Sequence, residues 1–193
     1  NHVTKNIAAK LEQSNKILNK GISRTEPTPP VSGLSLCERN YYEIGKPMLE
    51  RRFPEYMPSI AAGLVGEGSD CLGFDDDISR DHDFGPGFCI WLPHDGYARI
   101  GSQMQAAYDE LPNSFMGYTR HTTPEGESRV GVFSIDDFYR RYIGDMPKSN
   151  VDWLKLPASH LLTAVNGKVF EDPCGQFTNL RRQLLAFYPK DVW

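Results

Sequence analysis

Two short groups of residues, close together in the chain, have side chains and backbone suited to binding a metal-bound phosphate. Gly68 and Ser69 follow an apolar run, and eleven residues separate Ser69 from the Asp-x-Asp pair of Asp81 and Asp83. Glycine lets the backbone approach a ligand closely, while a serine hydroxyl and the N–H groups that follow it can bind phosphate oxygens. Two neighbouring carboxylates repel each other unless a cation lies between them, and such oxygen ligands suit Mg²⁺ or Mn²⁺.

Two strands of one sheet are expected to position these groups. Residues 59–65 are apolar or small, which predicts a strand buried on both faces. Residues 81–92 predict a second strand, with an irregularity at residues 85–87 because proline cannot donate to a sheet ladder. Side chains alternate along a strand, so Asp81 and Asp83 would share one face. The loop between the strands is long enough to bring both groups to the same end of the sheet.

Each group also has an ordinary interpretation. Gly68 and Ser69 are compatible with a turn from strand to helix in which Ser69 is the N-cap, and the two aspartates with a solvated acidic turn. The combination is rarer by chance than either part, which favours the phosphate and metal interpretation. Arg80 would then offset the charge of the acids or contact a phosphate. Asp70 would order the loop.

Other motifs in this segment fail on their required residues. Asp83-Phe84-Gly85 copies the metal-binding triplet of protein kinases, but no glycine-rich loop or strand lysine precedes it at a workable distance. A calcium-binding loop beginning at Asp75 would require glycine where Arg80 stands and glutamate where Pro86 stands. Neither the P-loop sequence nor the nucleophile-elbow sequence of α/β-hydrolases is present.

The remaining pattern predicts a mixed α/β fold, with a small mixed sheet packed by helices. We expect an N-terminal helix and Pro-rich linker over residues 1–32 and one domain over residues 33–193, whose C-terminal part either completes it or begins a second, helical domain. The basic pair Arg181-Arg182 is expected on a helix surface. The predicted helices cover residues 3–18, 34–53 with a break near Pro47, 95–111, 136–142, 156–165 and 177–187, and the further strands cover 115–121, 129–135 and 168–170.

Composition narrows the class of protein. Hydrophobic residues make up 39% and charged residues 24%, which is typical of a folded globular protein. The net charge of -4 argues against generic nucleic-acid binding, and no apolar run reaches the roughly 20 residues that a membrane span needs. The four cysteines form no CxxC pair, which favours free thiols in a reducing cytoplasm. A reactive thiol is a hypothesis for Cys71, next to the proposed phosphate site.

An apolar strand, Gly-Ser, eleven residues and Asp-x-Asp together resemble the signature of the nucleotidyltransferase superfamily, which has a polymerase-beta-like fold. Longer stretches resemble a bacterial family defined only as a domain of unknown function, DUF4037; they are GEGSDCLGFDDDISRDHDFGPGF, DWLKLPASHLL and NGKVFEDPCGQFTNLRRQLLAFYPKDVW. The similarity covers roughly residues 33–193. Members usually continue into a C-terminal helical region, and the abrupt end at Trp193 leads us to expect that region to be missing here.

This resemblance implies a reaction. Gly68 and Ser69 would bind the triphosphate of ATP or another nucleoside triphosphate, and Asp81 and Asp83 would bind two Mg²⁺ or Mn²⁺ ions. The metals would activate a hydroxyl of an unidentified small-molecule acceptor for in-line attack on the α-phosphorus. A nucleoside monophosphate, usually AMP, would be transferred and pyrophosphate released. His82, between the two acids, departs from the apolar residue that is usual in the superfamily.

The superfamily normally supplies a third carboxylate, often the general base, from a later strand. Asp136, at the end of the predicted strand over residues 129–135, is the first candidate, and Glu171 and Asp172 come next. Asp136 is equally compatible with a plain helix N-cap. Without a third acid, the alternative function is a catalytically inactive nucleotide-binding or regulatory module of the same fold. A third hypothesis is an interaction protein in which the acidic loop is only a surface.

Overall fold

The described part of the chain is arranged around a four-stranded sheet. A computed structural model describes residues 32–68, 70–72, 85–120, 129–144 and 156–187. Apolar and small residues make up the two central strands, which are buried along their whole length, as the apolar runs predict. The strands are β1 (Ala61–Leu64), β2 (Cys89–Leu92), β5 (Gly131–Ser134) and β6 (Lys168–Glu171), in the spatial order β5-β2-β1-β6.

The directions of the strands decide which loops meet. β1 is antiparallel to both of its neighbours, with Gly63 opposite Cys89 of β2 and Leu64 opposite Lys168 of β6. β2 and β5 are parallel, and Cys89 lies opposite Gly131. The C-terminal end of β1 therefore lies beside the first residues of β2, β5 and β6.

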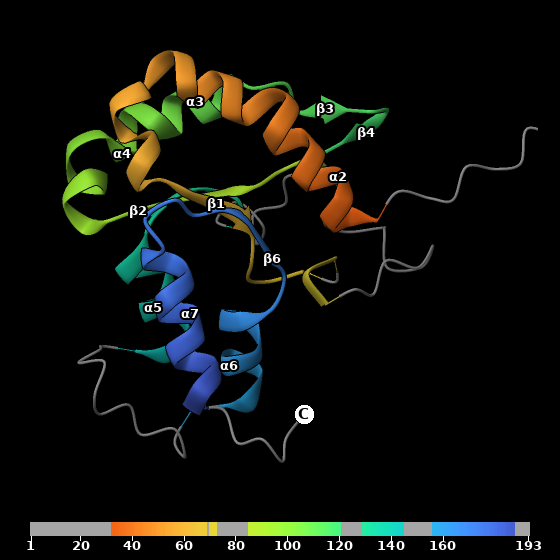
Figure 1. The fold of residues 1–193 in the computed structure, drawn as a ribbon. Helices are drawn as coiled ribbons and strands as arrows, with labels where there is room; N and C mark the ends of the chain where they lie inside the picture. The colour runs from red at the N-terminus through yellow and green to blue at the C-terminus, as the bar shows by residue number, and fades with distance from the viewer. Residues whose placement is uncertain (1–31, 69, 73–84, 121–128, 145–155, 188–193) are drawn as a thin grey trace, which may run out of the picture. The chain divides into compact units, whose positions relative to one another are not determined.

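Three helices cover one face of the sheet: α2 (Gly33–Asn40), α3 (Lys46–Arg52) and α4 (His94–Asp109) (Figure 1). A π-helix from Tyr41 to Gly45 joins α2 to α3, and a 3-10 helix (Pro54–Ser59) leads from α3 into β1. The break predicted near Pro47 takes the form of this π-helix. Pro47 itself falls in the first turn of α3, where a missing N–H costs little.

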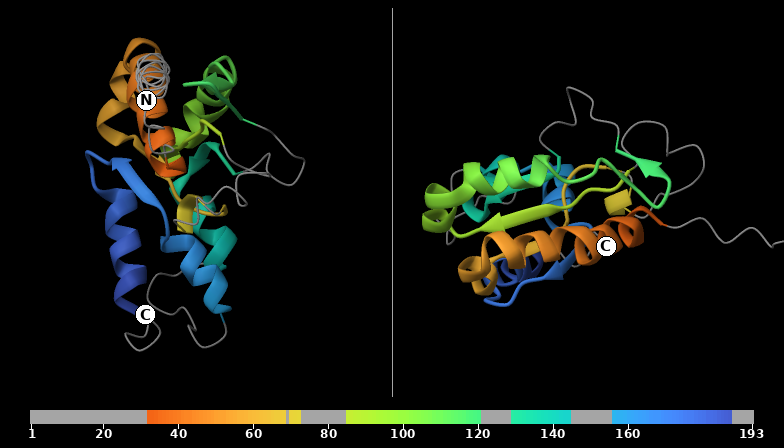
Figure 2. Two further views of the ribbon diagram at one scale, coloured as in Figure 1. Left: turned by 90° about the vertical axis from the view of Figure 1, so that its right-hand side faces the viewer. Right: turned by 90° about the horizontal axis from the view of Figure 1, so that it is seen from above.

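The other face is covered by α5 (Ile135–Ile143), α6 (Ala158–Val165) and α7 (Gln176–Phe187). Figure 2 shows these helices on the opposite side of the strands from α2, α3 and α4. Residues on alternate faces of the strands supply two separate cores. Ala62 and Ile90 pack towards α3 and α4, whereas Ala61 and Trp91 pack towards α5, α6 and α7.

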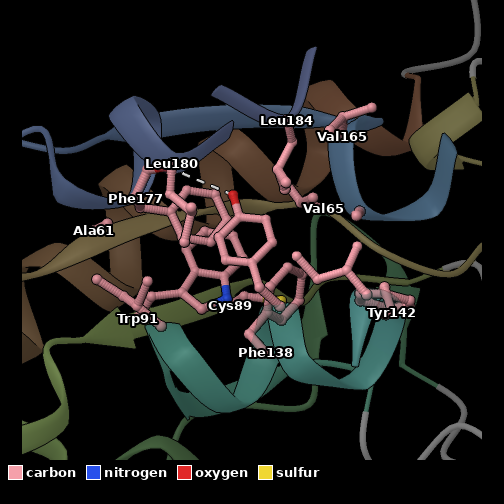
Figure 3. Close-up of a cluster of buried hydrophobic side chains, with 14 of the residues drawn as sticks. Ala61, Val65, Cys89, Trp91, Phe138, Tyr142, Val165, Phe177, Leu180 and Leu184 are labelled. Carbon is pink, nitrogen blue, oxygen red and sulfur yellow. Dashed lines mark hydrogen bonds between the residues drawn. The ribbon is translucent and has the colours of Figure 1, made fainter. Parts of the chain in front are cut away.

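Aromatic rings dominate the core between the sheet and α5, α6 and α7 (Figure 3). Trp91 of β2 stacks on Phe177 of α7 with ring centroids 4.0 Å apart and planes inclined by 20°. Phe138 of α5 meets Trp91 edge-on, at 5.3 Å and 73°. Such pairs contribute about 0.5–1.5 kcal/mol each beyond the area that they bury. They fix α7, and with it the C-terminal segment, against the centre of the sheet.

The predicted mixed α/β class is confirmed, while the specific nucleotidyltransferase fold remains a prediction. One local prediction was wrong. The strand predicted over residues 115–121 is a hairpin of β3 (Ser114–Phe115) and β4 (Tyr118–Thr119), because Met116 and Gly117 turn the chain with φ of 52° and 85°. The irregularity predicted at residues 85–87 is confirmed, and the described strand after it begins at Cys89. The predicted N-terminal helix lies outside the described residues.

None of the described helices combines the length and apolar character needed to cross a membrane.

Candidate functional site

The structure describes two of the residues predicted to form the site, Gly68 and Asp136. The others fall outside the described ranges and remain predictions; they are Ser69, Arg80, Asp81 and Asp83. The chain on either side of these residues is described, however. Its geometry shows where the described residues nearest to them in the chain lie.

Gly68 lies just beyond β1, where β2, β5 and β6 begin. We call this part of the molecule the glycine end and define it by residues 66–68, 70–72, 85–88, 129 and 166–167. The opposite part, where β2 and β5 finish and α4 and α5 begin, is called the Asp136 end. The two ends are separated by the length of the strands.

A turn at Gly66–Gly68 carries the chain out of β1. Gly66 and Gly68 have φ of 121° and 117°, values that residues with side chains rarely adopt. A Cβ on Gly66 would lie 3.1 Å from the Tyr142 hydroxyl, and one on Gly68 would lie 2.3 Å from the Arg129 guanidinium. Both the backbone conformation and the neighbours therefore require glycine. The sequence predicted a close backbone approach here, and the nearest described group is an arginine.

A buried ion pair fixes the chain just after this turn. Arg129 donates to a carboxylate oxygen of Asp70 and, through Nε, to the Glu67 carbonyl at 2.7 Å. The side chains of Arg129 and Asp70 are 10% and 5% exposed, so water screens their charges little. Burial acts to lower the pKa of Arg129, but the charge of Asp70 outweighs it and holds that pKa above its ordinary value. Asp70 also accepts the N–H of Cys71 at 2.9 Å. Asp70 thus fixes the start of the loop that follows the turn, and the rest of this loop, residues 73–84, lies outside the described residues.

The chain that leads into β2 packs against the same region. The Gly85 carbonyl accepts a hydrogen bond from the Cys37 thiol at 3.4 Å, and Cys37 packs with Leu64 and Cys71. The Phe88 N–H donates to the Tyr108 hydroxyl at 3.1 Å. Gly85 is therefore held against the end of β1, and the Phe88 carbonyl accepts the N–H of Gly131, the first residue of β5, at 3.2 Å.

Arg120, which follows β4, adds positive charge beside this segment. It donates to the Tyr108 hydroxyl at 3.0 Å, and its guanidinium lies 5.4 Å from the centre of the Tyr108 ring. A Cβ on Gly85 would lie 2.6 Å from the Arg120 Cα, so only glycine allows the two backbones to come this close. Arg120 and Arg129 thus lie at the two ends of the connection between β4 and β5, and Arg120 borders the approach to β2.

The thiols are free, as predicted. Cys71, for which a reactive role was a hypothesis, is buried, and its burial together with the charge of Asp70 raises its pKa to about 12. Its thiol donates weakly to the Glu67 carbonyl at 3.7 Å. Because the thiolate is the reactive form, Cys71 is a packing residue at neutral pH. Cys174 is the exposed thiol.

Asp136 lies at the other end of the sheet, and the structure does not bring it near Gly68. Leu92 is the last residue of β2 and pairs with Ser134, so Asp136 follows the far end of β5. The alternative role of N-cap belongs to Ser134, whose hydroxyl accepts the Asp137 N–H at 3.5 Å. Asp136 instead lines a pocket of about 430 Å³, together with Pro93, His94, Ile135, Gln176, Asn179, Leu180 and Gln183.

The other two candidates for a third carboxylate also lie away from Gly68. Glu171 lies opposite Ala62, towards the start of β1, and binds Lys46 at 2.9 Å and the Tyr41 hydroxyl at 3.0 Å. Asp172 accepts the Thr178 N–H at 2.8 Å at the start of α7. Among the described residues, no group of three or more His, Cys, Asp or Glu side chains is placed to hold a metal ion. Among the described residues, Glu67 within the Gly66–Gly68 turn and Asp70 just after it are carboxylates at this position.

Sequence reasoning missed Asn166 and Arg181. Asn166-Gly167 was interpreted only as a helix end, and Arg181 as a surface charge. In the structure Asn166 binds both backbone groups of Gly66, and Arg181 donates to the carbonyls of residues 165–167. The expectation of a surface charge is therefore wrong for Arg181 and holds for Arg182, which is exposed. Neither contact has a sequence signal, because each joins segments that are distant in the chain or separated by a turn.

Comparison with known proteins connects the C-terminal segment to a family. Residues 153–193 match the model of a family described as "Domain of unknown function (DUF4037)". This match confirms the predicted resemblance to DUF4037 over residues 153–193, while the resemblance over residues 33–152 remains a prediction. It includes α6, β6 and α7, and hence Asn166 and Arg181. Neither the curated proteins nor the solved structures that were compared with the chain gave a match.

Proposed function

We propose that this chain is a metal-dependent nucleotidyltransferase that moves a nucleoside monophosphate, AMP from ATP in the first instance, to a hydroxyl of a small acceptor. The antiparallel pairing of β1 with β2 is the observation that carries the proposal. It sets the Gly66–Gly68 turn beside the residues that lead into β2. A phosphate-binding turn and an Asp-x-Asp pair on these two segments would then adjoin one end of the sheet.

Covalent connectivity supports this arrangement. Ser69 is bonded to Gly68, and Asp83 precedes Gly85 by two residues. Gly68 and Gly85 both belong to the glycine end.

The described groups there also fit a magnesium-complexed triphosphate. Gly66 and Gly68, on either side of Glu67, leave the turn without a Cβ at two positions, and Arg120 brings positive charge to the border of the site, while Asp70 offsets the charge of Arg129. Mg²⁺ bound by Asp81 and Asp83 would neutralise the phosphates and activate the acceptor oxygen. The protein would supply positioning, because in-line displacement at phosphorus is governed mainly by orientation and electrostatics.

Pyrophosphate release tests the proposal. Purified protein with Mg-ATP and a mixture of hydroxyl-bearing acceptors should release pyrophosphate, and Asp81→Asn combined with Asp83→Asn should lower the rate on the order of a thousandfold or more. The far-UV circular dichroism of the double variant should match that of the wild type. Turnover retained by the folded double variant would place the active site elsewhere.

A specific observation also favours the second candidate, an inactive nucleotide-binding or regulatory module. Asp136 lies at the wrong end of the sheet for a general base, and Asp70 is already paired with Arg129. Titration of Mg-ATP by calorimetry, run beside the pyrophosphate assay, separates the two functions. Saturable binding without pyrophosphate release would identify the module.

A further inference from the structure

The Gly66–Gly68 turn is fixed by a side chain one hundred residues further along the chain. The Gly66 N–H donates to Asn166 Oδ1 at 2.9 Å, and Asn166 Nδ2 donates to the Gly66 carbonyl at 2.7 Å. The side-chain amide of Asn166 thus bonds both the N–H and the carbonyl of Gly66, as one residue of a hydrogen-bonded pair does in an antiparallel sheet. Two reciprocal bonds set the direction of both peptide planes that flank Gly66, whereas a single bond would leave rotation about its axis.

The turn that carries Asn166 is seated against the chain on both sides of Gly66. Gly167 has φ of 64°, and a Cβ there would lie 2.1 Å from the Leu64 carbonyl oxygen. The Gly167 N–H donates to the Cys71 carbonyl at 2.9 Å. The Asn166-Gly167 turn therefore contacts the end of β1, the glycine turn and the residues that follow it. These contacts let the Asn166-Gly167 turn fix the backbone at Leu64, Gly66 and Cys71.

Arg181 of α7 holds this second turn in place. Its Nη2 donates to the carbonyls of Val165, Asn166 and Gly167 at 2.7, 2.9 and 3.0 Å. These oxygens include the end of α6, where the helix dipole favours a cation. Burial lowers the pKa of Arg181, but arginine keeps its charge at physiological pH. Hydrogen bonds from a charged donor are roughly twice as strong as neutral ones.

We propose that Asn166 is a positioning residue for the phosphate-binding turn, supported by Arg181. The segment that matches DUF4037 then has a defined task at the glycine end. It orients the backbone of Gly66–Gly68 for the nucleotide without contacting the nucleotide itself. This inference rests on the proposed function for its ligand, but its geometry stands on described residues alone.

Asn166→Ala tests the inference, with Asn113→Ala as the matched control. Asn113 is exposed and lies at the start of the β3–β4 hairpin, so its truncation leaves the glycine turn intact. Loss of a supporting hydrogen bond behind a ligand-binding group commonly weakens binding by about tenfold or more. We therefore expect the Kd for Mg-ATP, measured by calorimetry, to rise about tenfold in Asn166→Ala and to stay at the wild-type value in Asn113→Ala.

Hydrogen exchange followed by mass spectrometry gives a readout that needs no nucleotide. Asn166→Ala should exchange faster in peptides that cover residues 64–72, while peptides from α4 exchange at the wild-type rate. If Asn166→Ala does not fold, Asn166→Ser, which adds no charge and is too short to bind both backbone groups of Gly66, takes the place of the alanine variant in both measurements.

The outcomes separate the two proposals. Weaker Mg-ATP binding with locally faster exchange supports the positioning role. Equal binding by a folded Asn166 variant and the wild type overturns that role and leaves the proposed function standing. If the wild type does not bind Mg-ATP, the proposed function fails. The exchange measurement then decides on Asn166 alone, and unchanged exchange over residues 64–72 overturns its role.

Discussion

The two ends of the sheet hold their polar residues in different ways. At the glycine end, Arg129 and Asp70 form a buried ion pair, and Asn166 pairs with the backbone of Gly66. At the Asp136 end, Asp136 lines an open pocket, and the neighbouring pair of Arg140 and Asp137 is more than half exposed.

These polar groups are buried and paired at the glycine end, whereas those at the Asp136 end are exposed to water. Buried polar groups are costly unless each is paired, so a region rich in satisfied buried groups has one well-defined geometry. Exposed pairs are screened by water and are easily rearranged. A site that must orient a triphosphate needs the first kind of region, and the four predictions below test whether the glycine end behaves as one.

The largest effect on stability is expected from Arg129→Met. It leaves the carboxylate of Asp70 buried without its partner, which typically costs about 3–5 kcal/mol. Arg140→Met at the other end breaks an exposed pair and should cost about 0.5 kcal/mol or less. Urea unfolding measures both. Arg129→Met combined with Asp70→Asn should recover part of the loss, and equal stability of the two single variants would contradict the contrast.

Gly68→Ala should be destabilising, while Gly96→Ala should be neutral or stabilising. The first adds a Cβ at φ of 117° and within 2.3 Å of the Arg129 guanidinium, a strain of about 1–3 kcal/mol. The second adds a Cβ in the first turn of α4 at ordinary contact, 3.7 Å from Leu92, and should gain up to about 1 kcal/mol. Thermal unfolding of both variants checks the sign. A Gly68→Ala protein as stable as the wild type would show that the turn is not constrained.

The Asn166 variants test the glycine end through its affinity for Mg-ATP rather than through the stability of the fold. A tenfold loss of Mg-ATP affinity is equivalent to about 1.4 kcal/mol. Arg181→Lys should give a smaller effect in the same direction, because a single ammonium cannot replace a guanidinium that spans neighbouring carbonyls. Calorimetry with both variants gives the ranking. Asn166 contacts Gly66 directly, whereas Arg181 acts through the Asn166-Gly167 turn. A larger loss of affinity from Arg181→Lys than from Asn166→Ala would contradict this arrangement.

The smallest effect is expected from Asp136→Asn. Asp136 lies in the first turn of α5, so loss of its charge should cost about 0.3–1 kcal/mol of stability. Because it lies away from Gly68, pyrophosphate release and Mg-ATP affinity should stay within about twofold of the wild type. A loss of activity as large as that expected for the Asp81 and Asp83 variants would make Asp136 the third carboxylate and contradict its placement at the other end.

Apolar periodicity was sufficient to predict most of the elements. The run over residues 59–65 became β1, and the helix predicted over 95–111 is α4. Apolar periodicity did not predict the turn at Met116-Gly117, where residues with positive φ split one predicted strand into two. Ser134 displaced Asp136 as the cap of α5 because the strand ends one residue before the helix starts.

The site was predictable only in part, for a physical reason. The type and spacing of Gly68, Ser69, Asp81 and Asp83 predict a ligand from local sequence, and this remains a prediction because Ser69, Asp81 and Asp83 lie outside the described residues. The pairing of Arg129 with Asp70 and of Asn166 with Gly66 depends on strand order, which brings together segments 59 and 100 residues apart. No local pattern encodes such contacts, so the supporting groups became visible only in the fold.

The most direct test of the central claim is Mg-dependent binding of ATP, measured by calorimetry with and without Mg²⁺. The matched variants are Asp81→Asn with Asp83→Asn, and Asp75→Asn with Asp76→Asn. The second pair belongs to the acidic run of residues 75–77, for which we expect no part in metal binding. We predict saturable, Mg-dependent binding by the wild type and the Asp75 and Asp76 variant, and its loss in the Asp81 and Asp83 variant. Undiminished binding by the folded Asp81 and Asp83 variant, or no binding by the wild type, would contradict the account.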